Sequence, residues 1–275
     1  MNNLKTMSNL KWVLLFIGAS FLFFLLYGIT SSFWYEFAER NAEIPGAIIT
    51  FALTPLIIWT YRGWQKRLEH QEELDGKMKD LCFWTAKGFA LGFFIFALTV
   101  LLMTTLGVYK IDHFNANWKS PLCHFLVFTN VAVGEEVLFR GILFRMIDKR
   151  WNTIAAITST ALLFGLTHLP NDNATLWSAI AIAIEAGILL GVVYKWAGNI
   201  WYPIGLHWAW NFSQGCIFGF NVSGTYSGIP LITPTCEGPD LLTGGAFGAE
   251  ASIITVLVGL ATAIYYWRKL KNINK

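Results

Sequence analysis

Three short polar clusters stand within stretches of the chain that are otherwise apolar. They contain carboxylates, imidazoles, a guanidinium and an amide at helical spacing, and comprise Glu135, Glu136, Arg140, Phe164, His168, His207 and Asn211. Ionisable groups at membrane depth are costly, so a chain that keeps several of them there is expected to use them together. Groups of these types move protons, bind metals or stabilise an oxyanion.

The two adjacent glutamates are expected to have different roles. Neighbouring residues on a helix diverge by roughly 100°, so Glu135 and Glu136 cannot both face one target. Glu136 and Arg140 are spaced i, i+4 and share a helix face. Arg140 is expected to keep Glu136 ionised, and Glu135, without a close counter-charge, is suited to act as a general base. A buried structural ion pair with a neighbouring carboxylate is the alternative interpretation.

The histidines and the asparagine supply the remaining groups of a hydrolytic site. His168 and His207 can each carry a proton or bind a metal through a neutral ring nitrogen. Asn211 follows His207 by one helical turn, where its amide can donate to a developing oxyanion. Phe164 is expected to pack against His168. Either histidine alone is more often a packing residue, so the catalytic interpretation depends on all of these groups occurring together.

The composition indicates that these residues lie in a membrane. Of 275 residues, 55% are hydrophobic and 13% are charged, which is too apolar for an ordinary soluble domain. A spanning helix needs about 20 mainly apolar residues. The sequence therefore predicts one all-α membrane domain over residues 1–275, with about eight spans at 12–30, 44–61, 83–108, 121–147, 153–169, 177–194, 200–219 and 250–267.

The distribution of basic residues predicts the orientation. The connections on one side carry only Arg40, Lys110 and Lys119. The connections and termini on the other side carry many more, namely Lys5, Lys11, Arg62, Lys66, Arg67, Lys77, Lys79, Arg145, Lys149, Arg150, Lys195, Arg268, Lys269, Lys271 and Lys275. By the positive-inside rule we expect a multi-pass protein of the cell membrane with both termini in the cytoplasm.

Two connections are long. Residues 62–80 carry mixed charges and predict a charged cytoplasmic loop, more plausibly a solvated connector than a functional segment. Residues 219–249 contain many glycines and prolines and no Lys or Arg, which predicts an irregular outer loop. A connector is the simpler interpretation of this second segment, and a lid over the bundle is the alternative.

Other polar residues within the apolar runs have no assigned role. Glu185 lies in the middle of its run, where it can be protonated, pair with Arg140 or line a chamber. Lys87 lies near a cytoplasmic helix end and is expected to extend its charge to the interface. The cysteines lack metal-binding spacing, and their disulfide state stays open: Cys82, Cys123, Cys216 and Cys236.

The three clusters resemble the signature motifs of a known family. The segments EEVLFRG (135–141), FGLTH (164–168) and HWAWN (207–211) are similar to the EExxxR, FxxxH and HxxxN motifs of the CPBP intramembrane proteases. This family includes the type II CAAX prenyl endopeptidases and bacterial proteins linked to bacteriocin processing and self-immunity (Abi). Every motif position is filled, and a looser resemblance to the protease domain extends over residues 83–267.

The resemblance implies a helical bundle around a polar intramembrane chamber in which a peptide bond is hydrolysed. By motif position, the resemblance implies that Glu135 and His168 activate water. It implies that His207 and Asn211 stabilise the oxyanion, and that Glu136 and Arg140 support these residues. The expected substrate is a membrane-associated peptide or protein in contact with the lipid bilayer, and no nucleic acid is expected to bind. The compact chain favours the bacterial branch over prenylated substrates.

The resemblance leaves the role of a metal open. Glu135, His168 and His207 could form a three-ligand catalytic zinc site with water in the fourth position, which would make the protein a metalloprotease. The chain has no HExxH helix, so the familiar zinc-protease geometry is absent. We favour metal-free catalysis by the glutamate.

Two other classes of function compete with proteolysis. A non-proteolytic membrane scaffold or regulator would use the same bundle to bind a partner, although a complete motif set argues against this. A transporter would predict interrupted spans related by an internal repeat, and the two halves show no convincing repeat.

Overall fold

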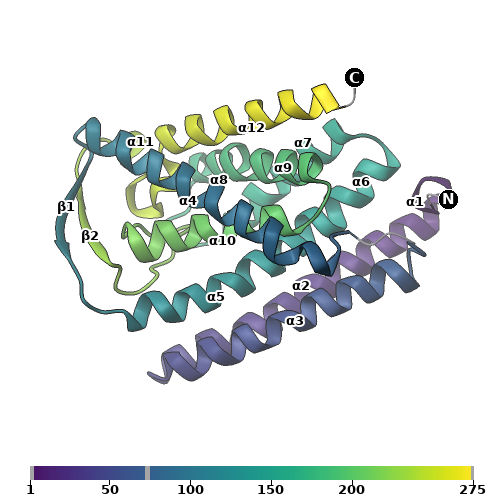
Figure 1. The fold of residues 1–275 in the computed structure, drawn as a ribbon, viewed down its shortest axis with the longest axis horizontal. Coiled ribbons are helices and arrows are strands. Elements are labelled where there is room, and N and C mark those ends of the chain that lie inside the picture. The colour runs from purple at the N-terminus through teal and green to yellow at the C-terminus, as the bar shows by residue number, and fades with distance from the viewer. Residues whose placement is uncertain (1–2, 72–74, 274–275) are drawn as a thin grey trace.

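Long helices form one bundle, with the two chain ends at one end and a small sheet at the other (Figure 1). The computed structural model describes residues 3–71 and 75–273. In chain order the elements are α1 (Asn3–Thr6), α2 (Asn9–Glu39), α3 (Glu43–Arg67), η1 (Met78–Asp80), α4 (Leu81–Thr105), β1 (Tyr109–Phe114), α5 (Lys119–Glu136), η2 (Val137–Phe144), α6 (Arg145–Arg150), α7 (Thr153–Thr167), α8 (Leu176–Ile182), η3 (Ala183–Ile188), α9 (Leu189–Ala197), α10 (Trp201–Asn211), η4 (Phe212–Ile217), β2 (Ile232–Cys236), α11 (Asp240–Thr243), η5 (Gly245–Phe247), η6 (Ala249–Ala251) and α12 (Ile253–Ile273).

The predicted helical membrane bundle is confirmed. Each of the eight apolar runs forms a helix. Among the described residues, six continuous helical segments are long and apolar enough to cross a membrane: Asn9–Glu39, Glu43–Arg67, Met78–Thr105, Lys119–Arg150, Leu176–Ala197 and Ile253–Asn272. The other two runs form shorter helices, α7 and α10 with η4.

The segments that carry the polar clusters lie at the centre of the bundle. In the most apolar stretch of Lys119–Arg150, which carries the first cluster, 61% of residues are buried inside the protein, against 17% in that of α2. The neighbouring segment Leu176–Ala197, which carries Glu185, is buried to 67% in its most apolar stretch. Helix α10 packs so closely along α4 that a β-carbon on Gly88 or Gly92 would lie only 2.0 or 2.3 Å from a carbonyl oxygen of α10. The polar residues on these helices are therefore surrounded by protein and shielded from lipid.

Three central helices change locally to π-helical geometry. These segments are η2, which begins directly after Glu136, η3, which contains Glu185, and η4, which begins directly after Asn211. Single turns of π-helix are uncommon and frequently occur at functional sites. Their positions mark the region around the polar clusters.

A two-stranded antiparallel sheet, formed by β1 and β2, closes the end of the bundle away from the termini. The prediction of an irregular segment at 219–249 is therefore only partly correct, since it contains β2, α11 and η5. Helical periodicity cannot reveal this pair, because the strands are short and more than a hundred residues apart in sequence.

The segment 62–80 is more ordered than a solvated connector. Its first residues continue α3 as far as Arg67, and residues 72–74 lie outside the described residues. Glu69 is buried and binds Arg145, with 2.7 Å between Oε1 and Nη2. Asp75 accepts hydrogen bonds from the hydroxyls of Tyr61 and Tyr194, at 2.9 and 2.8 Å. The buried partners lie on distant helices, which explains why the charges of this segment look solvated in the sequence.

Candidate active site

A fully buried ion pair forms the base of the site. Nη1 of Arg140 lies 2.9 Å from Oε1 of Glu136, and neither side chain is exposed to solvent. Nη2 of Arg140 also donates to the carbonyl oxygens of Ala186 and Gly187, at 3.4 and 3.3 Å, in π-helical η3. The predicted pairing of Glu136 with Arg140 is present, and it joins η2 to η3.

His207 lies between the two adjacent glutamates. Its Nδ1 is 2.9 Å from Oε1 of Glu136, and its Nε2 is 3.9 Å from Oε2 of Glu135. A carboxylate only accepts, so the proton of Nδ1 points to Glu136 and Nε2 is directed toward Glu135. Both glutamates thus approach the same imidazole, from opposite edges, so the prediction that they cannot face one target is wrong for His207. The two ring nitrogens point in different directions, which lets side chains that diverge along the helix reach the ring from two sides.

Glu135 is the more accessible of the two carboxylates. Its side chain is 17% exposed, against 0% for Glu136. Oε1 accepts a hydrogen bond of 3.3 Å from the hydroxyl of Tyr27 in α2, which sequence reasoning did not identify. Glu135 therefore has a carboxylate oxygen near solvent and near an imidazole, which a general base requires.

His168 presents one ring nitrogen to the same region. Its Nδ1 lies 2.6 Å from the carbonyl oxygen of Phe164, which can only accept, so Nδ1 carries the proton and Nε2 is left as the acceptor of a neutral ring. The ring of Phe164 lies 4.8 Å from the ring of His168, as predicted, and 4.7 Å from the guanidinium of Arg140. Phe164 therefore connects two of the polar clusters.

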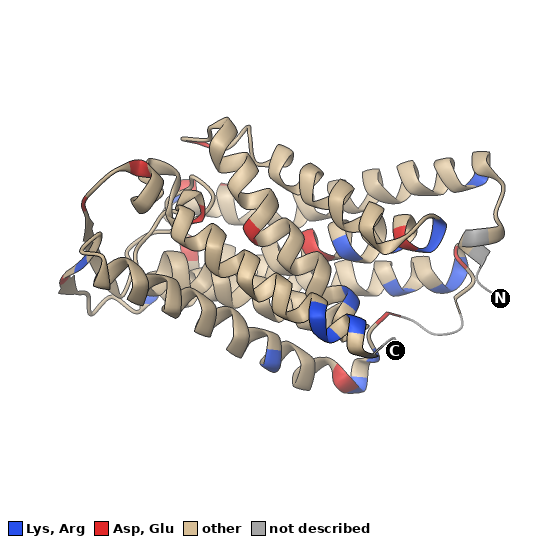
Figure 2. Cartoon of the chain, turned by 90° about the horizontal axis from the view of Figure 1, so that it is seen from above, with Lys and Arg blue, Asp and Glu red and all other residues tan. Residues whose placement is uncertain are grey.

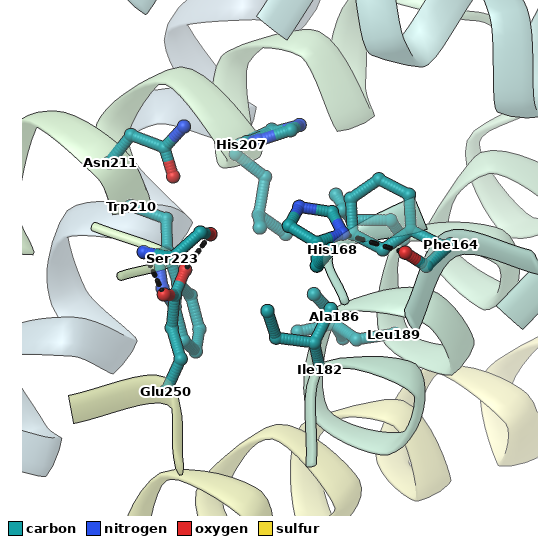
Figure 3. A pocket seen from close by; sticks show the side chains of 12 residues that line it. Phe164, His168, Ile182, Ala186, Leu189, His207, Trp210, Asn211, Ser223 and Glu250 are labelled. Atoms are coloured by element: carbon teal, nitrogen blue, oxygen red, sulfur yellow. Dashed lines mark hydrogen bonds between the residues drawn. The ribbon is translucent and has the colours of Figure 1, made fainter. Parts of the chain in front are cut away.

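The clusters converge on one cavity of about 540 Å³. Glu135, His168, His207 and Asn211 all line it. Clefts that bind small ligands commonly have volumes of about 300–1,000 Å³, so this cavity can hold a short length of peptide. His168, His207 and Asn211 also line a smaller inner pocket of about 20 Å³, which Figure 3 shows. This inner pocket is large enough for a water molecule.

The outer segment, residues 219–249, and the short helix η6 at its end contribute two residues that sequence reasoning missed. Glu250 and Ser223 line the inner pocket with the histidines (Figure 3). Glu250 is buried and accepts hydrogen bonds from the backbone N–H and the hydroxyl of Ser223, at 2.6 and 3.3 Å. Burial raises the pKa of Glu250, and the Ser223 N–H opposes this shift. The position of Glu250, at the start of an apolar run, was the available signal.

The outer segment also closes over the site. Ser223 has a positive φ of 49°, and its carbonyl oxygen accepts from Asn171, 2.9 Å away, in the turn after His168. Thr225, Tyr226, Ser227 and Gly228 continue along the wall of the large cavity. The segment therefore does more than connect two helices.

Glu185 does not join the site. It is completely buried in η3, and neither of its carboxylate oxygens has a hydrogen-bond partner among the described residues. The donors of Arg140 are directed to Glu136 and to backbone carbonyls instead. Glu185 lies outside the lining of both cavities, so protonation is the one of the three sequence options that agrees with its surroundings.

Among the described residues, no three His, Cys, Asp or Glu side chains gather in a group that could hold a metal ion. The Nδ1 atoms of His168 and His207 are both engaged by oxygen acceptors within the protein. All four cysteines are free thiols, and Cys123 and Cys216 are buried as small apolar residues.

Residues 117–213 match the family model described as Rce1-like, type II CAAX prenyl endopeptidase. This range contains all seven residues of the three clusters. The resemblance to CAAX-type intramembrane proteases is therefore confirmed for this part of the chain.

An uncharacterized protein of Bacillus subtilis (strain 168), YpbD, is 28% identical over 90 residues. This similarity covers 32% of the present chain and 42% of YpbD, so the chain spans less than half of the length of this curated relative. No solved structure gives a significant match.

Proposed function

We propose that this protein is an intramembrane endopeptidase in which Glu135 activates a water molecule. The observation that carries the proposal is the convergence of Glu135, His168, His207 and Asn211 on one cavity. These residues come from α5, α7 and α10, and their side chains offer a base, a proton carrier and two hydrogen-bond donors. A structural ion pair alone would not require this arrangement.

The proposed reaction begins with a water molecule between Glu135 and the peptide carbonyl. Glu135 removes a proton as the water oxygen attacks, and the carbonyl oxygen becomes an oxyanion. Nε2–H of cationic His207 and the amide of Asn211 donate to this oxyanion. Neutral His168 accepts at Nε2 the proton that Glu135 removed from water and passes it to the leaving amine as the carbon–nitrogen bond breaks, which returns Glu135 to its ionised form. The products are a new carboxylate and a new amine.

Glu136 and Arg140 have a supporting role in this proposal. Glu136 accepts from Nδ1 of His207, so it favours the cationic ring that can donate to the oxyanion. Arg140 in turn compensates the charge of Glu136 in a region without water. Neither side chain lines the large cavity, so neither contacts the substrate.

The mouth of the cavity favours a substrate from the outer side of the membrane. Tyr35 and Tyr226, which line the cavity, are 60% and 68% exposed. Tyr35 lies near the C-terminal end of α2 and Tyr226 lies in the segment before β2, and Figure 1 shows β2 and the junction of α2 with α3 at the end of the bundle away from the chain ends. Most Lys and Arg residues gather toward the opposite end, where both termini lie (Figure 2). With the termini in the cytoplasm, the mouth faces outward. We therefore propose an exported or membrane-associated polypeptide as the substrate, rather than a prenylated cytosolic protein.

The test is a cleavage assay with purified protein in phosphatidylethanolamine and phosphatidylglycerol vesicles. A mixture of internally quenched peptides serves as the substrate, and Glu135→Gln serves as the matched inactive variant. We expect the wild type to cleave peptides before and after prolonged chelation, and Glu135→Gln to remain folded and lose turnover. Normal turnover in Glu135→Gln would refute the assigned base. Activity that disappears on chelation and returns with stoichiometric zinc would establish a metalloprotease.

Folded wild-type protein that cleaves no peptide in any of these conditions would favour the scaffold or regulator alternative. This outcome is separate from the assignment of the base, because it is read from the wild type alone.

A further inference from the structure

A tyrosine from the N-terminal helix reaches the proposed base. Tyr27 lies on α2, and its hydroxyl donates to Oε1 of Glu135 at 3.3 Å. The helix α2 precedes the region that matches the family model, so the motifs themselves do not include this contact. Tyr27 and Glu135 both line the large cavity.

The residue before the glutamate pair makes room for this tyrosine. A β-carbon on Gly134 would lie 2.3 Å from Cδ2 of Tyr27 and 2.7 Å from Cγ. These distances are too short for any side chain, so the aromatic ring can lie against α5 only because residue 134 is glycine. The sequence Gly134-Glu135 therefore combines a seat for the ring with an acceptor for its hydroxyl.

A second polar contact anchors α2 independently of the site. Asn130, one turn before Gly134, donates to the hydroxyls of Thr30 and Thr54 at 3.1 and 3.2 Å. Asn130 thereby joins α5 to α2 and α3, and all three side chains are buried. Because this anchor fixes α2 against α5, the hydroxyl of Tyr27 is held beside Glu135 before any substrate binds.

We infer that Tyr27 is a positioning residue for Glu135, and that Gly134 is required for this contact. The inference rests on the proposed role of Glu135 as the base. One carboxylate oxygen receives the phenol hydrogen bond, and the other remains directed toward His207 and the cavity.

Several other groups lie near Glu135, and they determine which control variant suits Tyr27→Phe. His207 faces it from α10, His168 lines the same cavity from the end of α7, and Glu136 and Arg140 are on its own chain segment. Tyr35 lies on α2 with Tyr27 and lines the same cavity, where it interacts electrostatically with Glu135 without a hydrogen bond between them. Tyr35→Phe is therefore the matched control for Tyr27→Phe in a titration of this carboxylate.

The experiment measures protonation of Glu135 without relying on proteolysis. Purified full-length protein in detergent is treated with dicyclohexylcarbodiimide at a series of pH values, and modification of Glu135 is quantified by peptide mass spectrometry. This reagent modifies protonated carboxyl groups, so the extent of modification falls as Glu135 ionises. We expect the midpoint to move to higher pH in Tyr27→Phe by about 0.5–1 pH unit, and to stay in place in Tyr35→Phe.

Gly134→Ala provides an independent route to the same contact. Because the new methyl group displaces the ring, this variant should show the same shift as Tyr27→Phe, and the double variant should show no further shift. In the cleavage assay, Tyr27→Phe should lower kcat about 3- to 30-fold at neutral pH, move the acid limb of the pH profile upward and leave the melting temperature nearly unchanged.

An unchanged midpoint in Tyr27→Phe would overturn the inference, whatever the protease activity. Additive shifts in the double variant would overturn the assigned role of Gly134. If the midpoint shifts while the wild type cleaves no peptide, the contact is established and the proposed function fails. The two ideas can therefore fail separately.

Discussion

Two buried arginines, only five positions apart on one helical segment, pair with glutamates in different ways. Arg145 is satisfied on all sides, since Nη2 and Nη1 bind Glu69 at 2.7 and 2.5 Å and Nε donates to the carbonyl of Gly141 at 2.7 Å. Arg140 binds Glu136 through one nitrogen, at 2.9 Å. Its Nε and the second oxygen of Glu136 are buried without a hydrogen-bond partner among the described residues.

Under the proposed function, this difference separates a structural ion pair from one that supports catalysis. The Arg145 cluster uses its hydrogen-bonding capacity to join the segment after α3 to the centre of the bundle. The Arg140 cluster leaves polar atoms unused, adjoins π-helical turns and holds His207 at the edge of a cavity. A buried polar group without a hydrogen-bond partner is costly. Such groups are present in the Arg140 cluster and not in the Arg145 cluster among the described residues, which indicates that the two clusters have different roles.

The largest expected effect on stability comes from breaking the saturated pair. Arg145→Ala leaves Glu69 buried without a counter-charge, and we expect the free energy of unfolding to fall by about 3–5 kcal/mol. Lys149→Ala, on the same helix, is the matched control and should have little effect. Denaturant unfolding in detergent measures both variants. A loss below about 1 kcal/mol for Arg145→Ala would contradict the structural role of this cluster.

A substitution of Asn211 tests the cluster around His207, where we expect an effect on catalysis and little effect on stability. Asn211→Leu nearly keeps the size of the side chain and removes the amide donor without adding a charge, so kcat should fall about 100- to 1,000-fold, as for the loss of an oxyanion donor elsewhere. The melting temperature should change little, because no hydrogen bond within the protein depends on the amide among the contacts described. Cleavage of quenched peptides at saturating concentration measures the effect. A change confined to KM would assign Asn211 to substrate binding instead.

Arg140 should combine both kinds of effect at smaller size. Arg140→Lys keeps the charge beside Glu136 but cannot maintain every contact of the guanidinium, so we expect a loss of about 1–2 kcal/mol in stability and about tenfold in kcat. Thermal unfolding and the cleavage assay on the same preparation measure the two losses. Full activity with reduced stability would make this pair structural, like that of Arg145.

The smallest effect concerns Asp75, in the segment after α3. Burial raises the pKa of Asp75, although Arg145 and the hydroxyls of Tyr194 and Tyr61 oppose the shift. A raised carboxyl pKa contributes stability below the unfolded pKa of about 3.9, and this contribution is lost as pH rises through the folded value. Relative to Asp75→Asn, the free energy of unfolding of the wild type, measured by denaturant titration, should fall between acidic and neutral pH. An opposite slope would contradict the sign of the shift.

The sequence predicted those features that depend on local spacing. The eight helices follow from apolar runs, and the pairing of Glu136 with Arg140 follows from their i, i+4 positions. The motifs also identified four of the residues that line the cavity, namely Glu135, His168, His207 and Asn211. Their spacing could not show that His207 would lie between Glu135 and Glu136, because this depends on how α10 packs against α4 and α5.

Contacts between distant segments could not be predicted from local spacing. Tyr27 lies 108 positions before Glu135, and Glu69 lies 76 positions before Arg145. The bond between Ser223 and Glu250 arises within a glycine-rich segment that has no periodic pattern. In each case a polar residue looks unpaired or solvated in the sequence, and only tertiary packing brings its partner to it.

The most direct test compares Glu135→Gln with Glu69→Gln in one preparation series, with kcat for peptide cleavage and the melting temperature measured for each. We predict that Glu135→Gln keeps the wild-type melting temperature and loses at least about a thousandfold in kcat, because the base is gone. Glu69→Gln should lower the melting temperature and keep the kcat of the molecules that remain folded. Wild-type kcat in Glu135→Gln, or loss of kcat without loss of stability in Glu69→Gln, would contradict the division between catalytic and structural clusters.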